Sequence, residues 1–461
     1  MVSESRDGVL APHRRATTIG LLLVITLVGF EALAIATVMP EVSRDLNGIS
    51  LYGWVFSAFL LAQLVGIVVA GTSADRYGPE RPFLIGLVLL ALGLIIGALA
   101  PSMEVLVGAR AIQGLGAGVI PAVAYVVIGR AYPTQMQPRM FAMLSTAWVV
   151  PSLMGPAIAA VIASAFGWRW VFAGIIPIVA IAALLAAPPM RRLPPTVRSP
   201  DAEPPASLAG AIQVALGSGL FLAGLLAHNL FALIALCAIG GAIAVNALRK
   251  LVPTGTLRAL PGIPAAVLSR GLLTFAFFGV DAFITLAVEE VRGGSVAMGG
   301  FALTVGALCW TTGSWIQSHY VQRLHPPLLV RAGFATIGVA ILLFCIAVST
   351  SVSVFMFAVA WGVGGFGMGF AYAPISLVVL GGAEKGSEGR SSSALQLADV
   401  LGCAIGIGIG GALVAFGERS GWSPSSGLVI NACIDLLAVV AGVSIASRLR
   451  TPPLGAQIKA P

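Results

Sequence analysis

The chain has 461 residues, of which 58% are hydrophobic and only 10% are charged, and its mean hydropathy is +0.99. A soluble globular protein carries about 25% charged residues, and no soluble fold of this length could hide so much apolar surface. The sequence is therefore that of an integral membrane protein. The formal net charge of +8 does not indicate nucleic acid binding, because the basic residues are scattered through short loops.

Apolar runs of the length needed to cross a bilayer, about 20 residues each, recur along the whole chain. They group as six, two and six, which predicts an all-α polytopic membrane protein with 14 transmembrane helices. A count of 12 stays open, because the pair within 207–248 is the least certain. The predicted spans are 17–39, 51–74, 83–100, 104–129, 140–165, 169–189, 207–227, 229–248, 263–288, 296–318, 328–349, 352–380, 393–416 and 426–447.

The clearest linker is a Pro-rich, charged stretch that follows the sixth span and begins at Pro189-Met190-Arg191-Arg192. Such a composition is typical of a connection between domains. We therefore predict four parts. They are an N-terminal six-helix bundle at 1–190, a cytoplasmic linker at 191–206, two inserted helices at 207–250 and a C-terminal six-helix bundle at 251–461.

Basic residues are distributed unevenly between the two ends of the predicted spans. With the N-terminus inside, all but five of the 26 Lys and Arg residues fall in cytoplasmic segments or their flanks; Arg44, Arg169, Arg292 and Arg419 fall outside, and Arg110 lies within a span. An excess of basic residues marks the cytoplasmic side. We predict a multi-pass protein of the cell (inner) membrane with both termini in the cytoplasm.

Two lone acids occupy matching positions in the first span of each six-helix block. Gly29-Phe30-Glu31-Ala32-Leu33 matches Gly279-Val280-Asp281-Ala282-Phe283. A carboxylate near the middle of a membrane helix costs about 2.5–3.5 kcal/mol, so it is a functional candidate by default. The repetition predicts two pseudo-symmetric bundles of a duplicated transport machine.

Arg110, in the fourth span, needs a partner for the same reason. The helical rise places it about 9 Å from the outer end of its helix and places Glu31 about 12 Å from its own, depths that permit pairing across a central cavity. Alternatively, Arg110 snorkels outward from near the helix end.

A charged loop follows the second span and runs from Gly71 to Arg81. Gly71 permits close helix approach, and Gly78 suits a turn that requires positive φ. Asp75 and Arg76 could pair with neighbouring helix ends and form a cytoplasmic latch. The alternative is a solvated turn that only obeys the positive-inside rule.

Three segments resemble motifs of the major facilitator superfamily. Residues 71–81 resemble its G-x-x-x-D-R-x-G-R-[RK] loop, with Gly71, Asp75, Arg76 and Gly78 in place and Arg81 displaced by Pro79-Glu80. Residues 110–114, with Arg110, Gln113 and Gly114, resemble its R-x-x-Q-G element, which is implicated there in proton transfer. Residues 151–160 resemble the antiporter motif, with Gly155-Pro156 intact as an expected hinge. The corresponding second-half loop, Gly313 through Arg323, is degenerate, with Gln317-Ser318 where Asp-Arg would fall.

Residues 29–40 resemble the first-helix element of the fourteen-span drug:proton antiporter-2 family, with Glu31 on its Asp and Leu33 replacing its Thr. The resemblance implies a proton-coupled antiporter that exports amphipathic small molecules or drugs (multidrug efflux) by alternating access. Glu31, Arg110 and Asp281 are the expected proton-coupling residues. Two alternatives stay open: export of an endogenous lipid or siderophore-like metabolite, and a membrane regulator that transports nothing.

Five residues are candidates to line a substrate cavity: Gln113, Trp148, Trp310, Trp361 and Asp399. Aromatic rings could stack on an apolar ligand, and Asp399 could bind a cationic one or could simply be hydrated near its helix end. Asp435 has Asn431 one helical turn away, so we expect an internal hydrogen bond there instead of a transport role.

Enzymatic chemistry is not expected. The sequence contains no metal-ligand cluster, nucleophile elbow or phosphate-binding loop, so we predict no catalytic or metal-binding residue and no cofactor. The expected partners are protons, an amphipathic small-molecule substrate and the lipid bilayer, with no nucleic acid, and the expected state is a monomer.

Overall fold

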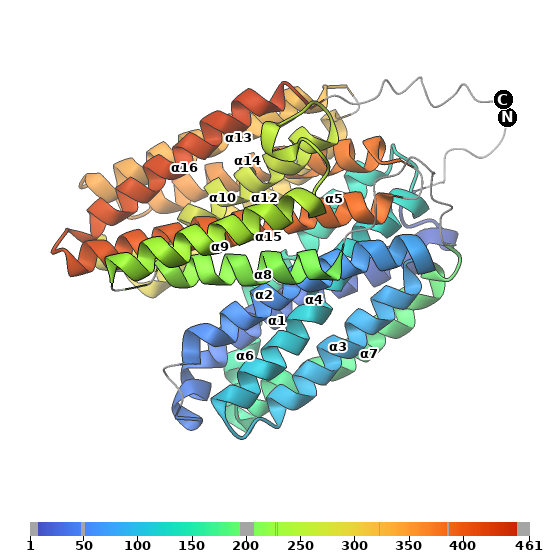
Figure 1. The fold of residues 1–461 in the computed structure, drawn as a ribbon, viewed down its shortest axis with the longest axis horizontal. Coiled ribbons are helices and arrows are strands. Elements are labelled where there is room, and N and C mark those ends of the chain that lie inside the picture. Colours follow the sequence, from blue (N-terminus) through green and yellow to red (C-terminus); the bar gives the residue numbers. More distant parts are fainter. Residues whose placement is uncertain are drawn as a thin grey trace. The chain divides into compact units, whose positions relative to one another are not determined.

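The computed structural model describes residues 8–47, 51–193, 207–225, 227, 229–321, 323–384 and 387–449, and every regular element in those ranges is a helix (Figure 1). Most of the predicted linker and both chain ends lie outside the described residues. The long helices are α1 (Pro12–Asp45), α2 (Tyr52–Tyr77), α3 (Glu80–Ala98), α4 (Met103–Ala131), α5 (Gln137–Ala147), α6 (Val149–Phe166), α7 (Arg169–Met190), α8 (Leu208–Leu225), α9 (Leu230–Leu251), α10 (Ile263–Asp281), α12 (Val296–Tyr320), α13 (Pro326–Ser349), α14 (Met356–Gly382), α15 (Glu388–Arg419) and α16 (Pro424–Ala446).

The predicted spans are confirmed as helical segments, with ends that differ by a few residues. Among the described residues, 13 helical segments are long and apolar enough to cross a membrane. The fourteenth predicted span is α12, which has 25 residues and is therefore long enough to cross a membrane. The all-α architecture with a six-two-six order of spans is therefore present.

The fifth span is interrupted in its middle, between α5 and α6 at Trp148. Pro151 accounts for the interruption, because a proline has no N–H to give to the carbonyl four residues earlier and its ring clashes there. That carbonyl belongs to Ala147, and it accepts a hydrogen bond from Thr26 Oγ1 on α1 instead, at 3.0 Å. Pro156, in the predicted hinge, lies inside the continuous part of α6.

The ninth span is interrupted immediately after Asp281. Here α10 ends, a short α11 (Ile284–Leu286) follows, and a π-helical segment, η4 (Ala287–Val291), completes the span. The amide N–H of Phe283 bonds to the carbonyl of Val280 at 2.9 Å, three residues back instead of four. The regular α-helical bonding therefore stops at the acid itself.

The chain divides into two compact units. The first unit comprises Met1–Leu216 and the segment Glu384–Gln396; the second comprises Gly217–Ala383 and Leu397–Pro461. Helix α15 begins in the first unit and continues in the second, so both units share it. In Figure 1 the long helices of the first unit run from blue to green.

Each unit is built around one glycine-rich helix, α4 in the first and α14 in the second. Alternate glycines face the two neighbouring helices: a Cβ at Gly114 would collide with the Phe59 carbonyl on α2, and one at Gly116 would lie 2.6 Å from the Leu90 nitrogen on α3. Removing the side chain lets backbones approach, which is how helices associate tightly in membranes.

The second unit repeats this arrangement on α14. A Cβ at Gly365 would collide with the Gly306 carbonyl on α12, and one at Gly367 would lie 3.0 Å from the Ile337 nitrogen on α13. The glycine-x-glycine spacing and the order of neighbours are the same as in α4. The structure thus supports the internal duplication that the paired acids predicted.

The duplicated glycines also fix which residues correspond between the halves. Arg110 stands four residues before Gly114, and Trp361 stands four residues before Gly365, so the two positions are equivalent. Gly86 on α3 corresponds to Gly333 on α13, because each meets its glycine-rich helix in the same way.

The same register corrects the predicted match for the loop after the second span. It aligns Asp75-Arg76 with Gln322-Arg323 instead of with Gln317-Ser318. The earlier match was wrong because it was anchored on a glycine, Gly313, that packs against α14 inside the helix. Gln322 itself lies outside the described residues.

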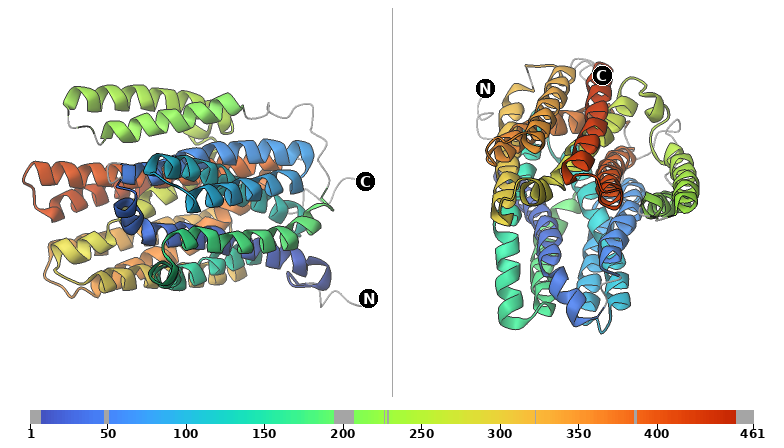
Figure 2. Two further views of the ribbon diagram at one scale, coloured as in Figure 1. Left: turned by 90° about the horizontal axis from the view of Figure 1, so that it is seen from below. Right: turned by 90° about the vertical axis from the view of Figure 1, so that its left-hand side faces the viewer.

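Helices α8 and α9 form an antiparallel pair, drawn in light green in Figure 2. Their contact again depends on glycine, since a Cβ at Gly240 would lie 2.5 Å from the Phe221 nitrogen. The buried residues of α9 are Gly240, Ala247 and Leu251, and the others are exposed or half-buried, as expected for a helix that meets lipid.

Two glycines of α4 provide a test of the close helix contacts. Gly114→Ala should destabilise the protein by about 1–3 kcal/mol, because the added methyl overpacks the α2 contact. Gly108→Ala on the same helix is the matched control: nothing lies within 4 Å of its Cβ position, so the change should be neutral or stabilising by about 0.5–1 kcal/mol. Thermal unfolding of the detergent-purified variants measures both. Equal effects at the two positions would contradict the packing described here.

Candidate functional site

Glu31 and Arg110 form an ion pair within the first unit. Arg110 Nη1 donates to Glu31 Oε1 on α1 and to Gln113 Oε1, one turn along α4, at 2.5 Å. The guanidinium also lies over the ring of Phe59, 4.1 Å from its centroid. The exposed fractions of Glu31, Arg110 and Gln113 are 0%, 2% and 0%.

The burial of Arg110 decides between the two interpretations left open by the sequence. A snorkelling arginine would place its guanidinium at the membrane surface, whereas this one points to the interior of the helix bundle and bonds to an acid there. An unpaired buried charge would be far more costly than a paired one. Within the described residues, Glu31 Oε2 and Gln113 Nε2 have no hydrogen-bond partner, so the acid retains a free oxygen.

Helix α6 packs against α1 close to this ion pair. The Cβ position of Gly155 is 3.6 Å from Leu33 Cβ, and a Cβ at Gly29 would lie 2.9 Å from the ring of Trp148, at the junction of α5 and α6. Trp148 is 43% exposed. The predicted hinge and one predicted cavity residue therefore both adjoin the turn that contains Glu31.

Asp281 has a neutral partner instead of a cation. Trp361 Nε1 donates to Asp281 Oδ1 at 2.5 Å, and the Trp361 side chain is 0% exposed. Its ring stacks on Phe277 with a centroid separation of 4.7 Å. Asp281 and Trp361 therefore occupy the same two helices of their unit as Glu31 and Arg110 do of theirs, with an indole in the place of the guanidinium.

A continuous row of aromatic rings extends from this position. Phe277 meets Trp310 at 5.6 Å between centroids, and Trp310 meets Tyr372 at 5.4 Å. Trp310 Nε1 is buried without a hydrogen-bond partner among the described residues. The row joins the carboxylate of Asp281 to that of Asp399, whose Oδ2 accepts from the Tyr372 hydroxyl at 2.8 Å.

Sequence reasoning missed the cation at the end of this row. Arg270 was assigned to the cytoplasmic flank of its span, but it lies on α10 with 0% exposure. Its Nη1 is 3.6 Å from Asp399 Oδ1, its Nη2 donates to Ser376 Oγ at 2.5 Å, and its guanidinium lies over the Tyr372 ring at 3.4 Å. Arg270 is the eighth residue of α10, so the sequence suggested a position at the cytoplasmic end of the span, and Arg270 belongs to no recognised motif.

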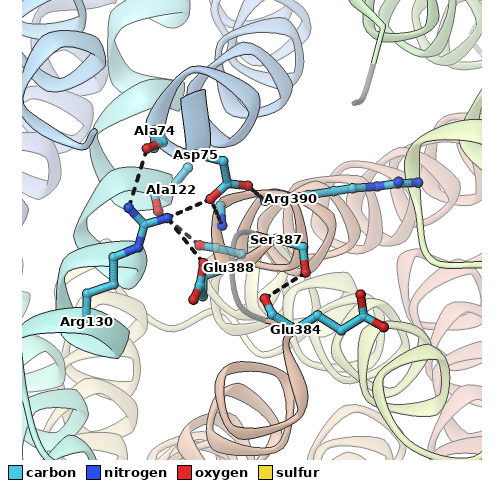
Figure 3. A network of polar contacts seen from close by, with 10 residues as sticks. Ala74, Asp75, Ala122, Arg130, Glu384, Ser387, Glu388 and Arg390 are labelled. Carbon is cyan, nitrogen blue, oxygen red and sulfur yellow. Dashed lines mark hydrogen bonds and ion pairs between the residues drawn. The ribbon is translucent and has the colours of Figure 1, made fainter. Parts of the chain in front are cut away.

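The predicted latch residue Asp75 is bound to the N-terminus of α15, within the first unit (Figure 3). Its two carboxylate oxygens accept from the backbone N–H groups of Gly389 at 2.8 Å and of Arg390 at 3.1 Å. These are free donors at the positive end of a helix dipole, where a carboxylate is stabilised. Arg130 Nη2 connects Asp75, at 2.7 Å, to Glu388, at 3.3 Å.

The remaining residues of this loop fall into two groups. Gly71 is required by the contact, because any side chain there would collide with the Gly389 carbonyl. Gly78 has φ of 80°, which confirms the expected turn with positive φ. Arg76 and Arg81 are exposed, as expected for the alternative of a solvated turn. Arg130 and Glu388 were missed because nothing in the sequence brings the fourth and thirteenth spans together.

At the other end of α1, Asp45 binds Trp168 and Arg169, which precede and begin α7. One carboxylate oxygen accepts from the Trp168 indole at 2.9 Å and from the Arg169 guanidinium at 3.0 Å. These hydrogen bonds, that of Trp168 first, hold the pKa of Asp45 below its ordinary value. The stabilisation is therefore present above the ordinary pKa of an aspartate and is lost as the pH falls through the lowered value.

No metal centre is formed by the described residues, since no group of three or more His, Cys, Asp or Glu side chains could hold an ion. Each unit thus has an acid with a buried partner in a membrane-length helix, the first unit with a charged contact at a helix end and the second with a row of aromatic rings. That combination is typical of a secondary transporter built from two homologous halves.

The sequence matches the family model of the Major Facilitator Superfamily over residues 21–407, and the chain belongs to this superfamily of transporters. It is similar to Multidrug resistance protein 3 of Bacillus subtilis, with 31% identity over 35% of this chain and 32% of the relative. It is also similar to the multidrug transporter protein MdtP of the same organism, with 26% identity over 40% of this chain and 34% of that relative. The chain thus spans about a third of the length of these curated relatives.

Solved structures show the same fold. The human organic anion transporter MFSD10 superposes with a TM-score of 0.70 at 14% identity, over 94% of this chain and 99% of that one. The proton:xylose symporter XylE gives a TM-score of 0.63 at 16% identity, over 92% of this chain and 94% of that one. At such identities the likeness concerns the fold alone.

The buried ion pair can be tested by a double-mutant cycle. Glu31→Met or Arg110→Met alone should destabilise the protein by about 3–5 kcal/mol, because each leaves one buried charge unpaired, whereas the double variant should recover most of that loss. Thermal unfolding in detergent gives the comparison. The control is the pair Glu80–Arg191, whose arginine is 68% exposed and whose removal should cost about 0–1 kcal/mol. Additive losses at Glu31 and Arg110 would show that the two charges do not interact.

Proposed function

We propose that this transporter exports amphipathic small molecules in exchange for protons, by alternating access. The observation that carries the proposal is the Glu31–Arg110 pair, a carboxylate and a guanidinium that lie inside membrane spans and bond to each other, with Gln113 as a further acceptor for Arg110. Two relatives that match parts of the chain are named multidrug resistance protein and multidrug transporter, and these names support export as the direction.

Glu31 is the proposed proton carrier of the first half. Binding of a proton by Glu31 removes the negative charge that holds the Arg110 guanidinium, so protonation and the contact with α4 are coupled. A proton that binds the free Oε2 weakens the ion pair and leaves Arg110 to Gln113. When the Arg110 guanidinium returns to Glu31, the acid releases its proton to the opposite side of the membrane. Asp281 has the corresponding place in the second half, with Trp361 holding its carboxylate.

The contact of Asp75 with α15 is the proposed cytoplasmic latch. It combines two backbone hydrogen bonds with a helix dipole and the bridging Arg130, and it holds one end of a helix that continues into the second unit. Release of Asp75 would free this end of α15. Gly71 and Gly78 make the close contact and the turn possible, and Arg76 and Arg81 keep the loop on the cytoplasmic side.

Substrate contacts are proposed for the partly exposed members of the aromatic row and for Trp148. Trp310 offers a free indole N–H, and Asp399 offers a carboxylate that a cationic ligand could share with Arg270. Gln113 and Trp361 are fully buried, so their proposed part is to hold Arg110 and Asp281 in place. Gly155 and Pro156 are proposed as the hinge that moves α6 beside Glu31.

The proposed setting is the cell (inner) membrane, with a monomer whose two termini are cytoplasmic. The distribution of Lys and Arg supports this orientation. Arg130 and Asp75 then lie on the cytoplasmic side, and Asp45 with Arg169 lies on the opposite side.

Glu31→Gln should abolish proton-driven export, because the amide keeps the shape of the acid but cannot carry a proton. Efflux of a fluorescent substrate from proteoliposomes under an imposed pH gradient measures this loss. Glu104→Gln is the matched control, since Glu104 is an exposed acid on α4 and its neutralisation should leave efflux unchanged. Full pH-coupled transport by the Glu31→Gln protein would remove Glu31 from the mechanism.

Asp75→Asn should lower the transport rate at least about tenfold, because an amide supplies no charge to the helix dipole and to Arg130, a combined loss of about 1.4 kcal/mol or more. The initial rate of efflux and equilibrium substrate binding are both measured, and binding should be retained. Glu80→Gln, which neutralises an acid at the start of α3, should change neither. A binding defect equal to the rate defect would argue against a latch and for a direct substrate contact.

A further inference from the structure

Asp435, on α16, is a buried acid that the proposed coupling residues do not include. Its exposed fraction is 0%. Asn431, one turn earlier, donates through Nδ2 to Asp435 Oδ2 at 3.0 Å, which confirms the internal hydrogen bond expected from the sequence. Within the described residues Asp435 forms no ion pair and its Oδ1 has no hydrogen-bond partner.

The carboxyl group of Asp435 lies directly against the backbone of α10. A Cβ at Gly279 would be 2.5 Å from Asp435 Oδ1 and 2.9 Å from Oδ2. Asn431 Nδ2 also donates to the carbonyl oxygen of Gly279, at 2.8 Å. One amide group therefore serves two acceptors, the acid on its own helix and a backbone carbonyl on the neighbouring helix.

That carbonyl is the one left free by the break in α10. In a regular helix Gly279 O would accept from the N–H of Phe283, but this N–H bonds to Val280 instead. The Asn431 amide replaces the missing helical bond. Asp435 and Asn431 therefore support the break that begins two residues beyond Gly279, at Asp281.

Among the described residues, the titratable and charged groups around Asp435 include no cation that neutralises it. Those on the neighbouring elements are Asp281 on α10, Cys345 on α13, Cys433 on α16 itself, Glu289 and Glu290 on η4, and Asp399 and Cys403 on α15. Arg270 lies beside Asp399. Arg292, after η4, donates to the carbonyls of Ala347 and Val352.

We propose that Asp435 is a second proton-binding site of this transporter, and that its occupancy controls the break in α10 that presents Asp281. The proposal rests on the proposed function in taking the proton as the coupling ion. In the arrangement described here Asp435 is the neutral acid, because a lone carboxylate at 0% exposure would cost far more than one shared hydrogen bond returns.

Loss of the proton to water would change the arrangement in a defined way. The resulting carboxylate has one N–H donor, the Asn431 amide hydrogen that bonds to Oδ2, and it needs more, so it must draw the second amide hydrogen to itself. That movement takes the amide from Gly279 O. The break in α10 then loses its support, and the carboxylate of Asp281, two residues further on, changes its position relative to Trp361.

Infrared spectroscopy tests the site without any substrate. A protonated carboxyl group has its own C=O stretching band, which disappears on ionisation, so a pH titration of the purified protein in nanodiscs counts the titrating acids. Asp435→Asn should remove one titrating band, because the amide mimics the neutral acid. The control Asp399→Asn, at an acid with a cation beside it, should leave that band in place. If Asp435→Asn removes no titrating band, the proposal is overturned.

Two further variants test the link to α10. Asn431→Leu and Gly279→Ala should each shift the titration midpoint of the Asp435 band and alter that of Asp281, which Asp281→Asn identifies. Gly411→Ala is the glycine control, since nothing lies within 4 Å of its Cβ position. A merely structural Asp435 would give unshifted titrations in all these variants, which would overturn the proposal.

The two proposals fail separately. Efflux by the unmodified protein with and without the imposed pH gradient decides whether export is proton-driven, whereas the Asp435 band is measured in the resting protein. A titrating Asp435 in a protein whose export ignores the pH gradient would leave the site in place and refute the coupling. Proton-driven export with no Asp435 band would refute the site alone.

Discussion

A charge inside a membrane span must find a partner within the protein, and the Glu31–Arg110 pair meets this requirement in the first unit. The pair fixes more than two side chains. It orients α1 against α4, it uses Gln113 and Phe59 to complete the surroundings of the guanidinium, and it places the α6 turn of Gly155 next to the acid. Because neither charge can remain buried alone without a large cost, any movement that separates α1 from α4 must first neutralise one of them.

In the second unit the acid that corresponds to Glu31 has no cation at the position that corresponds to Arg110. The same helix positions hold Asp281 and Trp361, so the acid receives one neutral hydrogen bond in place of an ion pair. The second unit has its own cation, Arg270, but on α10 and paired with Asp399 on α15. Duplication has thus preserved the backbone frame, which depends on glycines, while the chemistry on that frame has diverged.

The spans and the paired acids were predictable from sequence because both depend on local properties. Twenty apolar residues form a helix in lipid regardless of their neighbours, and an acid in such a run is conspicuous. Arg110 was predictable as a partner because it is equally conspicuous. The match between Arg110 and Trp361 was not, because the two residues share no chemistry and only the glycine contacts establish their equivalence.

Contacts between distant helices were the main omission. Asp75 was predicted either to pair with a neighbouring helix end or to lie in a solvated turn, but its partners at Gly389 and Arg390 are backbone N–H groups, which leave no trace in a sequence. The helix breaks were equally hidden. That at Trp148 follows from Pro151, three residues later, whereas that at Asp281 involves no proline and is visible only through the hydrogen bonds of Gly279 and Phe283.

The helix breaks at Trp148 and Asp281 have one physical feature in common. Each leaves a backbone carbonyl without its helical donor, and each carbonyl is served by a side chain from another helix: Thr26 for Ala147 and Asn431 for Gly279. A carbonyl in lipid cannot turn to water for a substitute donor. Each of these carbonyls therefore keeps a hydrogen bond only while its donor stays in place. Thr26 lies on the helix of Glu31, and Asn431 donates also to Asp435. Movement of α1 in the first unit, or a change in the charge of Asp435 in the second, thus acts directly on the backbone next to a coupling acid.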